Sequence, residues 1–190
     1  MPEIKGTFNA YNELQEYFFS GIKKTAGIIS LIKEEANIRN KLAELQREDS
    51  KITEQIKSLK VSLKLVEKED VKKAIEEIIS KLEKELEKAE DEFDELNCNL
   101  VDCEAERAEY ESYIKFLSDL DDEHCFWSNN SIIFEEFSIN EFIAFIFVIT
   151  NNGQAYFPTF NKKNMPETLH KVIDTIPDDW NSFIEWIEKN

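Results

Sequence analysis

Cysteine and histidine are the residue types in this chain best suited to metal binding or nucleophilic catalysis, and they are few. The 190 residues include three cysteines and two histidines. Cys98 and Cys103 are five residues apart, about 140° around a helix, so they diverge instead of sharing a zinc ion. His124 and Cys125 are adjacent, and adjacent side chains rarely point at one reacting centre. We expect these residues and His170 to be structural, with no catalytic residue, metal site or cofactor.

A cluster of acids near residue 120 has the right chemistry for a hard cation but the wrong pattern. An EF-hand loop needs a central glycine and a spaced glutamate, and both are missing here. Acids at the end of a helix also oppose its dipole, so we expect this helix to fray into a solvated turn. The acids are Asp119, Asp121, Asp122 and Glu123.

The strongest chemical signal is a run of carboxylates over 83–123. This run holds seventeen Asp and Glu against four Lys and Arg, which is −13 of a chain total of −17. Within 83–111 the net charge is −10. On a helix this is about one net charge per 4 Å, close to the ~3.4 Å phosphate spacing of one DNA strand. We predict a partner-binding face made of Glu83, Glu87, Glu90, Asp91, Asp94, Glu95, Asp102, Glu106 and Glu109.

Two interpretations of this anionic run stay open. In the first, it is a solvated helix face whose acids pair with lysines of a neighbouring helix, namely Lys51, Lys57, Lys60 and Lys64. In the second, the surplus charge imitates nucleic acid and occupies a basic groove on another protein. Exposed pairs of the first kind are individually weak.

The elements that carry these residues are predicted by heptad spacing. Over 28–66, core heptad positions follow one another at alternating steps of four and three residues, from Leu31 to Val66. Most of these positions are apolar, and Glu35 and Asp49 are the two acidic ones. A second such pattern over 71–117 contains a stutter from Leu82 to Leu86. We predict an antiparallel coiled-coil hairpin over 28–120 with a turn near 67–70 and Asp70 as N-cap. One continuous helix in an intermolecular coiled coil is the alternative.

The remaining chain predicts a small α+β module. Residues 132–137, 142–149 and 154–160 are β-type runs, and Asn151-Asn152-Gly153 suits a tight hairpin. Pro166 and Glu167 open a helix that Pro177 ends, and Asp178 can cap a last helix. We therefore expect residues 125–190 to form a three-stranded antiparallel β-meander with two helices. An amphipathic N-terminal helix over 1–27 packs on that module. The fold class is mainly α with a small α+β module.

Charge and composition narrow the function. A net charge of −17 disfavours direct binding to nucleic acid or an anionic membrane. The longest apolar run, 142–149, is far below the ~20 residues of a membrane span. The N-terminus lacks a secretory signal pattern, and three cysteines do not make a disulfide framework. A reducing cytoplasm is the expected compartment.

We expect a non-enzymatic acidic protein-binding module whose partner is a basic surface, such as that of a nucleic-acid-handling protein. Phage inhibitors of bacterial defence are similar to this chain in charge and size only, so that comparison is an analogy. A coiled-coil adaptor or oligomerisation scaffold is the alternative, and a homodimer stays open.

Overall fold

The computed structural model describes residues 11–127, 134–151 and 157–190. The chain divides into two compact units. The first unit contains residues 1–34 and 104–190, and the second contains residues 35–103. In the sequence, the second unit therefore interrupts the first.

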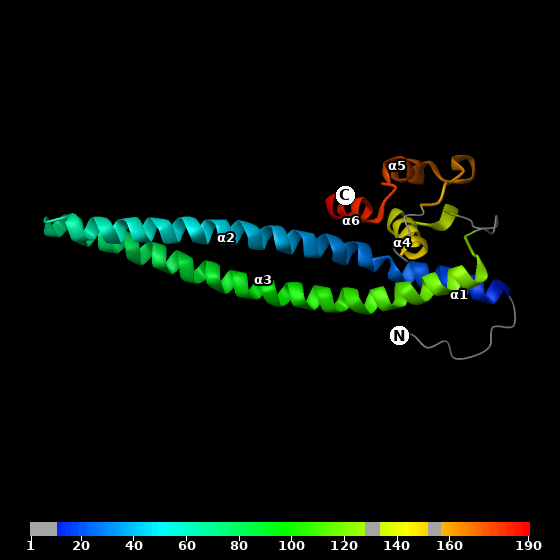
Figure 1. The fold of residues 1–190 in the computed structure, drawn as a ribbon, viewed down its shortest axis with the longest axis horizontal. Coiled ribbons are helices and arrows are strands. Elements are labelled where there is room, and N and C mark those ends of the chain that lie inside the picture. Colours follow the sequence, from blue (N-terminus) through cyan, green and yellow to red (C-terminus); the bar gives the residue numbers. More distant parts are fainter. Residues whose placement is uncertain (1–10, 128–133, 152–156) are drawn as a thin grey trace. The chain divides into compact units, whose positions relative to one another are not determined.

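The second unit is an antiparallel helical hairpin built from α2 (Gly27–Leu65) and α3 (Glu69–His124). Figure 1 shows the two helices side by side through this unit, joined by the turn at 66–68. Both helices lie where the heptad spacing predicts them. The carbonyl of Lys68 accepts the first helical hydrogen bonds of α3, from the amides of Val71 and Lys72. Asp70 therefore lies in the first turn of α3 and is not its N-cap.

The seam of α3 differs from the prediction at one point. Ile79 is buried, whereas its neighbour Ile78 is about half exposed. With Ile79 in the seam, the spacing from Ile75 to Leu86 alternates four, three and four residues. The predicted stutter at Leu82 is therefore wrong, because the choice of Ile78 as the core position created it.

The seam of α2 includes two acids, as the heptads predict. Glu35 is fully buried and its Oε2 lies 3.1 Å from Nη2 of Arg39, one turn further along the helix. Asp49 is half buried, and its Oδ1 is a buried atom without a hydrogen-bond partner. A carboxylate at a core heptad position specifies register at a cost in stability.

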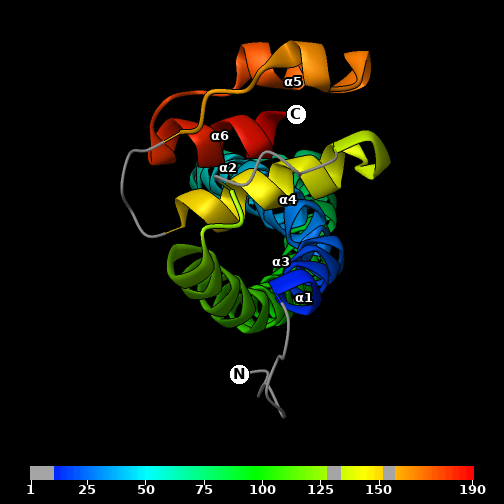
Figure 2. The same cartoon turned by 90° about the vertical axis from the view of Figure 1, so that its right-hand side faces the viewer.

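The first unit is also helical. It contains α1 (Tyr11–Thr25), α4 (Ile139–Thr150), α5 (Glu167–Thr175) and α6 (Trp180–Lys189), with 3-10 helices η1 (Phe134–Glu136) and η2 (Lys162–Asn164). The ends of α2 and α3 at 27–34 and 104–124 belong to it as well. Helix α4 contacts α1 and α5 and lies between them in Figure 2. The core of this unit is therefore organised around α4.

The predicted β-meander is wrong, and so is the α+β class, because the described residues contain no β-strand. The run 142–149 is the buried body of α4. Residues 134–136 form η1, residues 137 and 157–160 have no regular structure, and the rest of those two runs lies outside the described residues. Asn151 is the C-cap of α4, and Asn152 and Gly153 also lie outside the described residues.

A capping box explains why this apolar run is a helix. The Ser138 hydroxyl accepts a hydrogen bond from the Glu141 backbone amide at 3.3 Å, and the Glu141 carboxylate accepts one from the Ser138 backbone amide at 2.7 Å. This reciprocal pair satisfies two backbone donors that a helix start leaves open. Residues Phe142 to Val148 are all buried, so the helix is covered on every side. Such a helix shows no amphipathic period, which is why the run resembles a buried strand.

The other predicted helices of this unit are present with small differences. The helix predicted to open at Pro166 and Glu167 is α5, which has Pro166 as its N-cap and ends at Thr175, two residues before Pro177. The N-cap of α6 is Asp179, not Asp178: its carboxylate accepts the Ser182 amide at 2.9 Å. Aromatic side chains fill the space between these helices. The Phe147 and Trp180 rings join α4 to α6 at 4.8 Å, and Phe134 contacts Phe142 edge-on at 5.5 Å.

Candidate functional site

The predicted partner-binding acids are all exposed on α3. Seven of them, from Glu83 to Asp102, belong to the hairpin unit, whereas Glu106 and Glu109 belong to the first unit. We define the anionic face as the seven hairpin residues Glu83, Glu87, Glu90, Asp91, Asp94, Glu95 and Asp102. The net charge of residues 83–102 is −7.

Helical spacing arranges the anionic face in two stripes. Glu83, Glu87, Glu90 and Asp94 follow one another at steps of four, three and four residues, so they share one side of α3 beside the seam. Asp91, Glu95 and Asp102 form a second stripe about 90° further around, pointing away from the seam. The face thus spans about 140° of the helix circumference.

The lysines of α2 neutralise little of this charge. Lys60 Nζ donates to Glu83 Oε1 at 2.8 Å, with both side chains about half exposed. Among the described residues, the other six members of the face have no ion pair. Lys51, Lys57 and Lys64 are exposed but do not reach them. The proposed internal pairing therefore accounts for one of the seven acids.

Register explains this shortage of cations. Lys60 and Glu83 both occupy heptad position e, and these positions face each other in an antiparallel coiled coil. Beyond Lys57, further from the turn, the same side of α2 presents Thr53, Ser50 and Gln46. The carboxylates of Glu90 and Asp94 therefore face no lysine or arginine at these positions.

A hollow of about 430 Å³ opens on this side of the hairpin. It is lined by Gln46 and Asp49 of α2 and by Glu90, Phe93 and Asp94 of α3. Three carboxylates thus border one open space, but they do not converge tightly. In the part of the chain that the structure describes, no three Asp, Glu, His or Cys side chains are placed to hold a metal ion. The sequence reasoning missed this hollow, because it depends on how the two helices are aligned.

The cysteines and histidines are dispersed. Cys98 and Cys125 are exposed and Cys103 is half buried. His170 Nε2 lies 2.9 Å and 3.1 Å from the carbonyl oxygens of Lys162 and Met165, so the ring ties α5 to η2. His124 Nε2 lies 3.9 Å from the carboxylate of its neighbour Glu123.

The acids near residue 120 do not mark a frayed end. Helix α3 continues to His124, and Asp121 is buried. Its Oδ1 accepts the Trp127 amide at 3.0 Å, and its carbonyl accepts the Cys125 amide. Burial raises the pKa of the Asp121 carboxyl, against the lowering effect of the Trp127 amide. Asp121 therefore closes the end of the helix by holding the turn that follows it.

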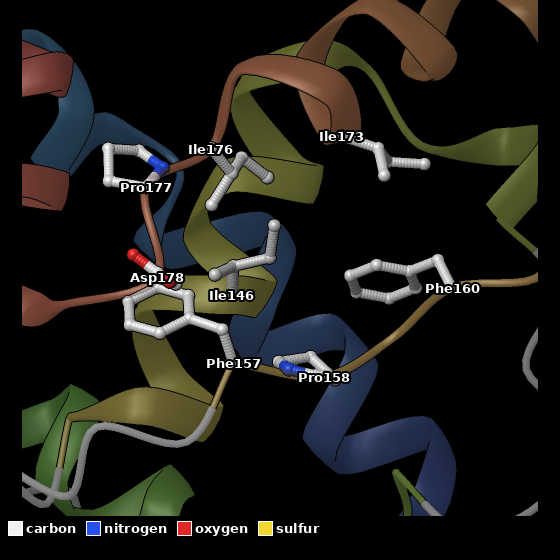
Figure 3. A pocket seen from close by; sticks show the side chains of 8 residues that line it. All are labelled: Ile146, Phe157, Pro158, Phe160, Ile173, Ile176, Pro177 and Asp178. Atoms are coloured by element: carbon white, nitrogen blue, oxygen red, sulfur yellow. The ribbon is translucent and has the colours of Figure 1, made fainter.

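Two further hollows lie among the described residues of the first unit. One, of about 80 Å³, lies between Ile146 of α4, the segment with Phe157 and Phe160, and the end of α5 (Figure 3). Its lining is apolar except for Asp178. The other, of about 490 Å³, is an open depression bordered by Glu136, Phe137 and five residues of α1, which are Gln15, Glu16, Phe19, Ser20 and Lys23, and Lys23 and Glu136 form an ion pair there.

The chain was compared with protein-family models, with curated proteins and with solved structures, and none of them matches it. No helix in the described parts of the chain is long and apolar enough to cross a membrane.

Proposed function

We propose that this chain is a non-enzymatic binding protein whose anionic face binds a basic surface on another protein. The observation that supports the proposal is the shortage of cations beside that face: six of its seven acids are exposed without an ion pair among the described residues.

The cost of keeping these acids supports a binding role. Neighbours such as Glu83 and Glu87, or Glu90 and Asp94, are four residues apart. Like charges at this spacing destabilise a helix by about 0.2–0.5 kcal/mol per pair. A partner that brings lysine or arginine to the face would relieve this repulsion and gain charge-assisted hydrogen bonds. A basic groove that normally holds nucleic acid has this chemistry, so an inhibitor of a nucleic-acid-handling protein is the specific form of the proposal.

The alternative is a coiled-coil adaptor, in which apolar contacts matter more than charge. The observation in its favour is a group of exposed apolar side chains near the turn of the hairpin, Val61, Leu65, Val71 and Ile78. The two functions differ in salt dependence. At 0.1 M salt, the attraction between exposed charges is largely screened beyond about 10 Å, and more salt shortens that range, whereas apolar contacts are weakened little.

A charge-neutralised variant tests the proposal. We would replace Glu87 and Glu90 by Gln and Asp94 by Asn, and measure binding to a labelled arginine-rich peptide and capture of partners from a native lysate. The matched control replaces Glu44, Glu48 and Glu54 by Gln, because these acids are also exposed in the same unit but lie on α2, outside the face. We expect the first variant, and not the control, to lose binding, and wild-type binding to weaken steeply with salt. Equal binding by both variants would reject the anionic face as the partner site.

A further inference from the structure

The second feature of the hairpin unit that points to a partner is apolar and lies near the turn. Val61 and Leu65 at the end of α2 are 59% and 79% exposed, and Val71 and Ile78 at the start of α3 are 42% and 47% exposed. Single exposed apolar residues are ordinary. Four of them within eighteen residues form a group at the end of the hairpin.

Heptad positions place most of this group on one side of the hairpin. Val71 and Ile78 both occupy position g of α3, one heptad apart, and Leu65 occupies the adjacent position c of α2. The e positions of the two helices face each other, as the Lys60–Glu83 hydrogen bond shows. The g positions must therefore face each other on the opposite side of the seam. Val61, at position f, extends the group outward.

The residues between these side chains are small and uncharged. On α3, Ala74 lies between Val71 and Ile78 at steps of three and four, the spacing of a second seam. On α2, Ser58 and Ser62 continue the spacing that ends at Leu65. All three small residues are exposed. We call these seven residues the tip seam: Ser58, Val61, Ser62, Leu65, Val71, Ala74 and Ile78. Helices with apolar residues at a, d and g usually pack against more than one neighbour, whereas each helix here has one neighbour within its unit.

Charge indicates which neighbour fits. Residues 57–81 carry a net charge of +2, whereas residues 83–102 carry −7. Two copies of so acidic a chain repel each other least over this segment, where the net charge of each copy is small. The tip seam also matches itself: large side chains project from α3, and serines leave space on α2. A twofold arrangement would set Val71 and Ile78 of one copy against Ser58 and Ser62 of its partner, as knobs enter holes.

We propose that the tip seam is a self-association surface, through which two copies of the chain pack their hairpin ends into a short four-helix bundle. The inference does not depend on the function of the anionic face. The seam spans about two turns on each helix, so it buries less than the roughly 800 Å² per partner of a standard interface. The dimer is therefore weak and forms at high concentration or where copies are brought together.

Sedimentation equilibrium of the full chain tests this, over a range from about 10 µM to about 1 mM that suits a weak interface. We expect the dimer fraction to rise with concentration for the wild type and to vanish for Ile78→Glu. The matched control is Val101→Glu, because Val101 is 62% exposed on the same helix but outside the tip seam. Ser62→Leu should lower the dimer fraction at least several-fold, because its side chain fills the space that Val71 and Ile78 of the partner would enter.

The outcomes are separable. A monomer at every concentration overturns the proposal, and leaves the tip seam to a different chain. Dimers that persist in Ile78→Glu, or that Val101→Glu abolishes equally, overturn it as well. Both substituted residues are exposed, so circular dichroism should show unchanged helix content. A dimer that survives 0.5 M salt and responds to Ile78 and Ser62 as stated supports the proposal, whatever the anionic face binds.

Discussion

Replacement of Gly21 by alanine should destabilise the first unit, although glycine is a poor helix former. Gly21 lies within α1 and is buried. A Cβ atom at this position would lie 2.8 Å and 2.9 Å from the two δ-carbons of Leu117 and 3.0 Å from the Tyr113 hydroxyl. Real Cβ atoms almost never approach other atoms this closely. Leu117 is fully buried, so its side chain has little freedom to move aside.

The expected size of the effect follows from two opposing terms. Alanine gains about 1 kcal/mol over glycine in a helix interior. Forcing an extra carbon into a packed core costs about 1–3 kcal/mol. Gly21→Ala should therefore lower the free energy of unfolding by up to about 2 kcal/mol. Gly27→Ala is the control: its Cβ would lie 3.7 Å from the Tyr110 hydroxyl, an ordinary contact, so we expect no loss.

Urea denaturation followed by circular dichroism measures both variants, and their m-values check that the unfolding transition is comparable. A double-mutant cycle with Leu117→Ala isolates the contact, because a smaller side chain at 117 should remove much of the penalty at 21. The reasoning is refuted if Gly21→Ala is as stable as Gly27→Ala with unchanged m-value. It is also refuted if the cycle shows no coupling between positions 21 and 117.

Three further predictions concern single side chains. Asp49→Leu should raise the free energy of unfolding by about 1–3 kcal/mol, because it replaces a buried carboxylate oxygen that lacks a hydrogen bond. Thermal melts should show this gain for Asp49→Leu and not for the control Glu48→Leu, because Glu48 is exposed. Cys125→Gly should stabilise the chain by about 0.5–1 kcal/mol in urea titrations, because Cys125 has a φ of 54°, a region that costs side-chain-bearing residues energy. Hydrogen bonds from Ser138 lower the pKa of Glu141. The resulting stability is present above the ordinary carboxyl pKa of about 4.3 and is lost as pH falls through the lowered value. Glu141→Gln should therefore differ most from wild type near neutral pH and converge with it in acid, which melting temperatures across a pH series would reveal.

The sequence was informative where its pattern had a period. The long helices followed from apolar residues spaced three and four apart, and the exposure of the anionic face followed from its positions outside the seam. Where two equivalent residues are adjacent, spacing could not choose between them. Ile78 and Ile79 are both apolar, and Asp178 and Asp179 can both cap a helix. Burial in the assembled hairpin selected Ile79, and backbone geometry selected Asp179.

Helix α4 shows a different limit. A segment that is buried on all sides carries no alternation between polar and apolar residues, so neither a strand nor a helix is favoured by period alone. The decisive signal was present in the sequence as Ser138 and Glu141, three residues apart before the apolar run. In the candidate site, the lack of cations beside Glu90 and Asp94 required the alignment of the two helices. Residue spacing along one helix does not give that alignment.

The interruption of the first unit by residues 35–103 has a consequence for the order of folding. The two halves of that unit are distant in the chain, so their contacts must close a long loop before they stabilise anything. A hairpin has mainly local contacts and forms early, with little entropy lost at each step. Once its helices pair, the effective separation between the halves falls sharply. Insertions or deletions that keep both arms equal should therefore leave refolding rates nearly unchanged, whereas a break in the hairpin turn should slow the assembly of helices that it never touches.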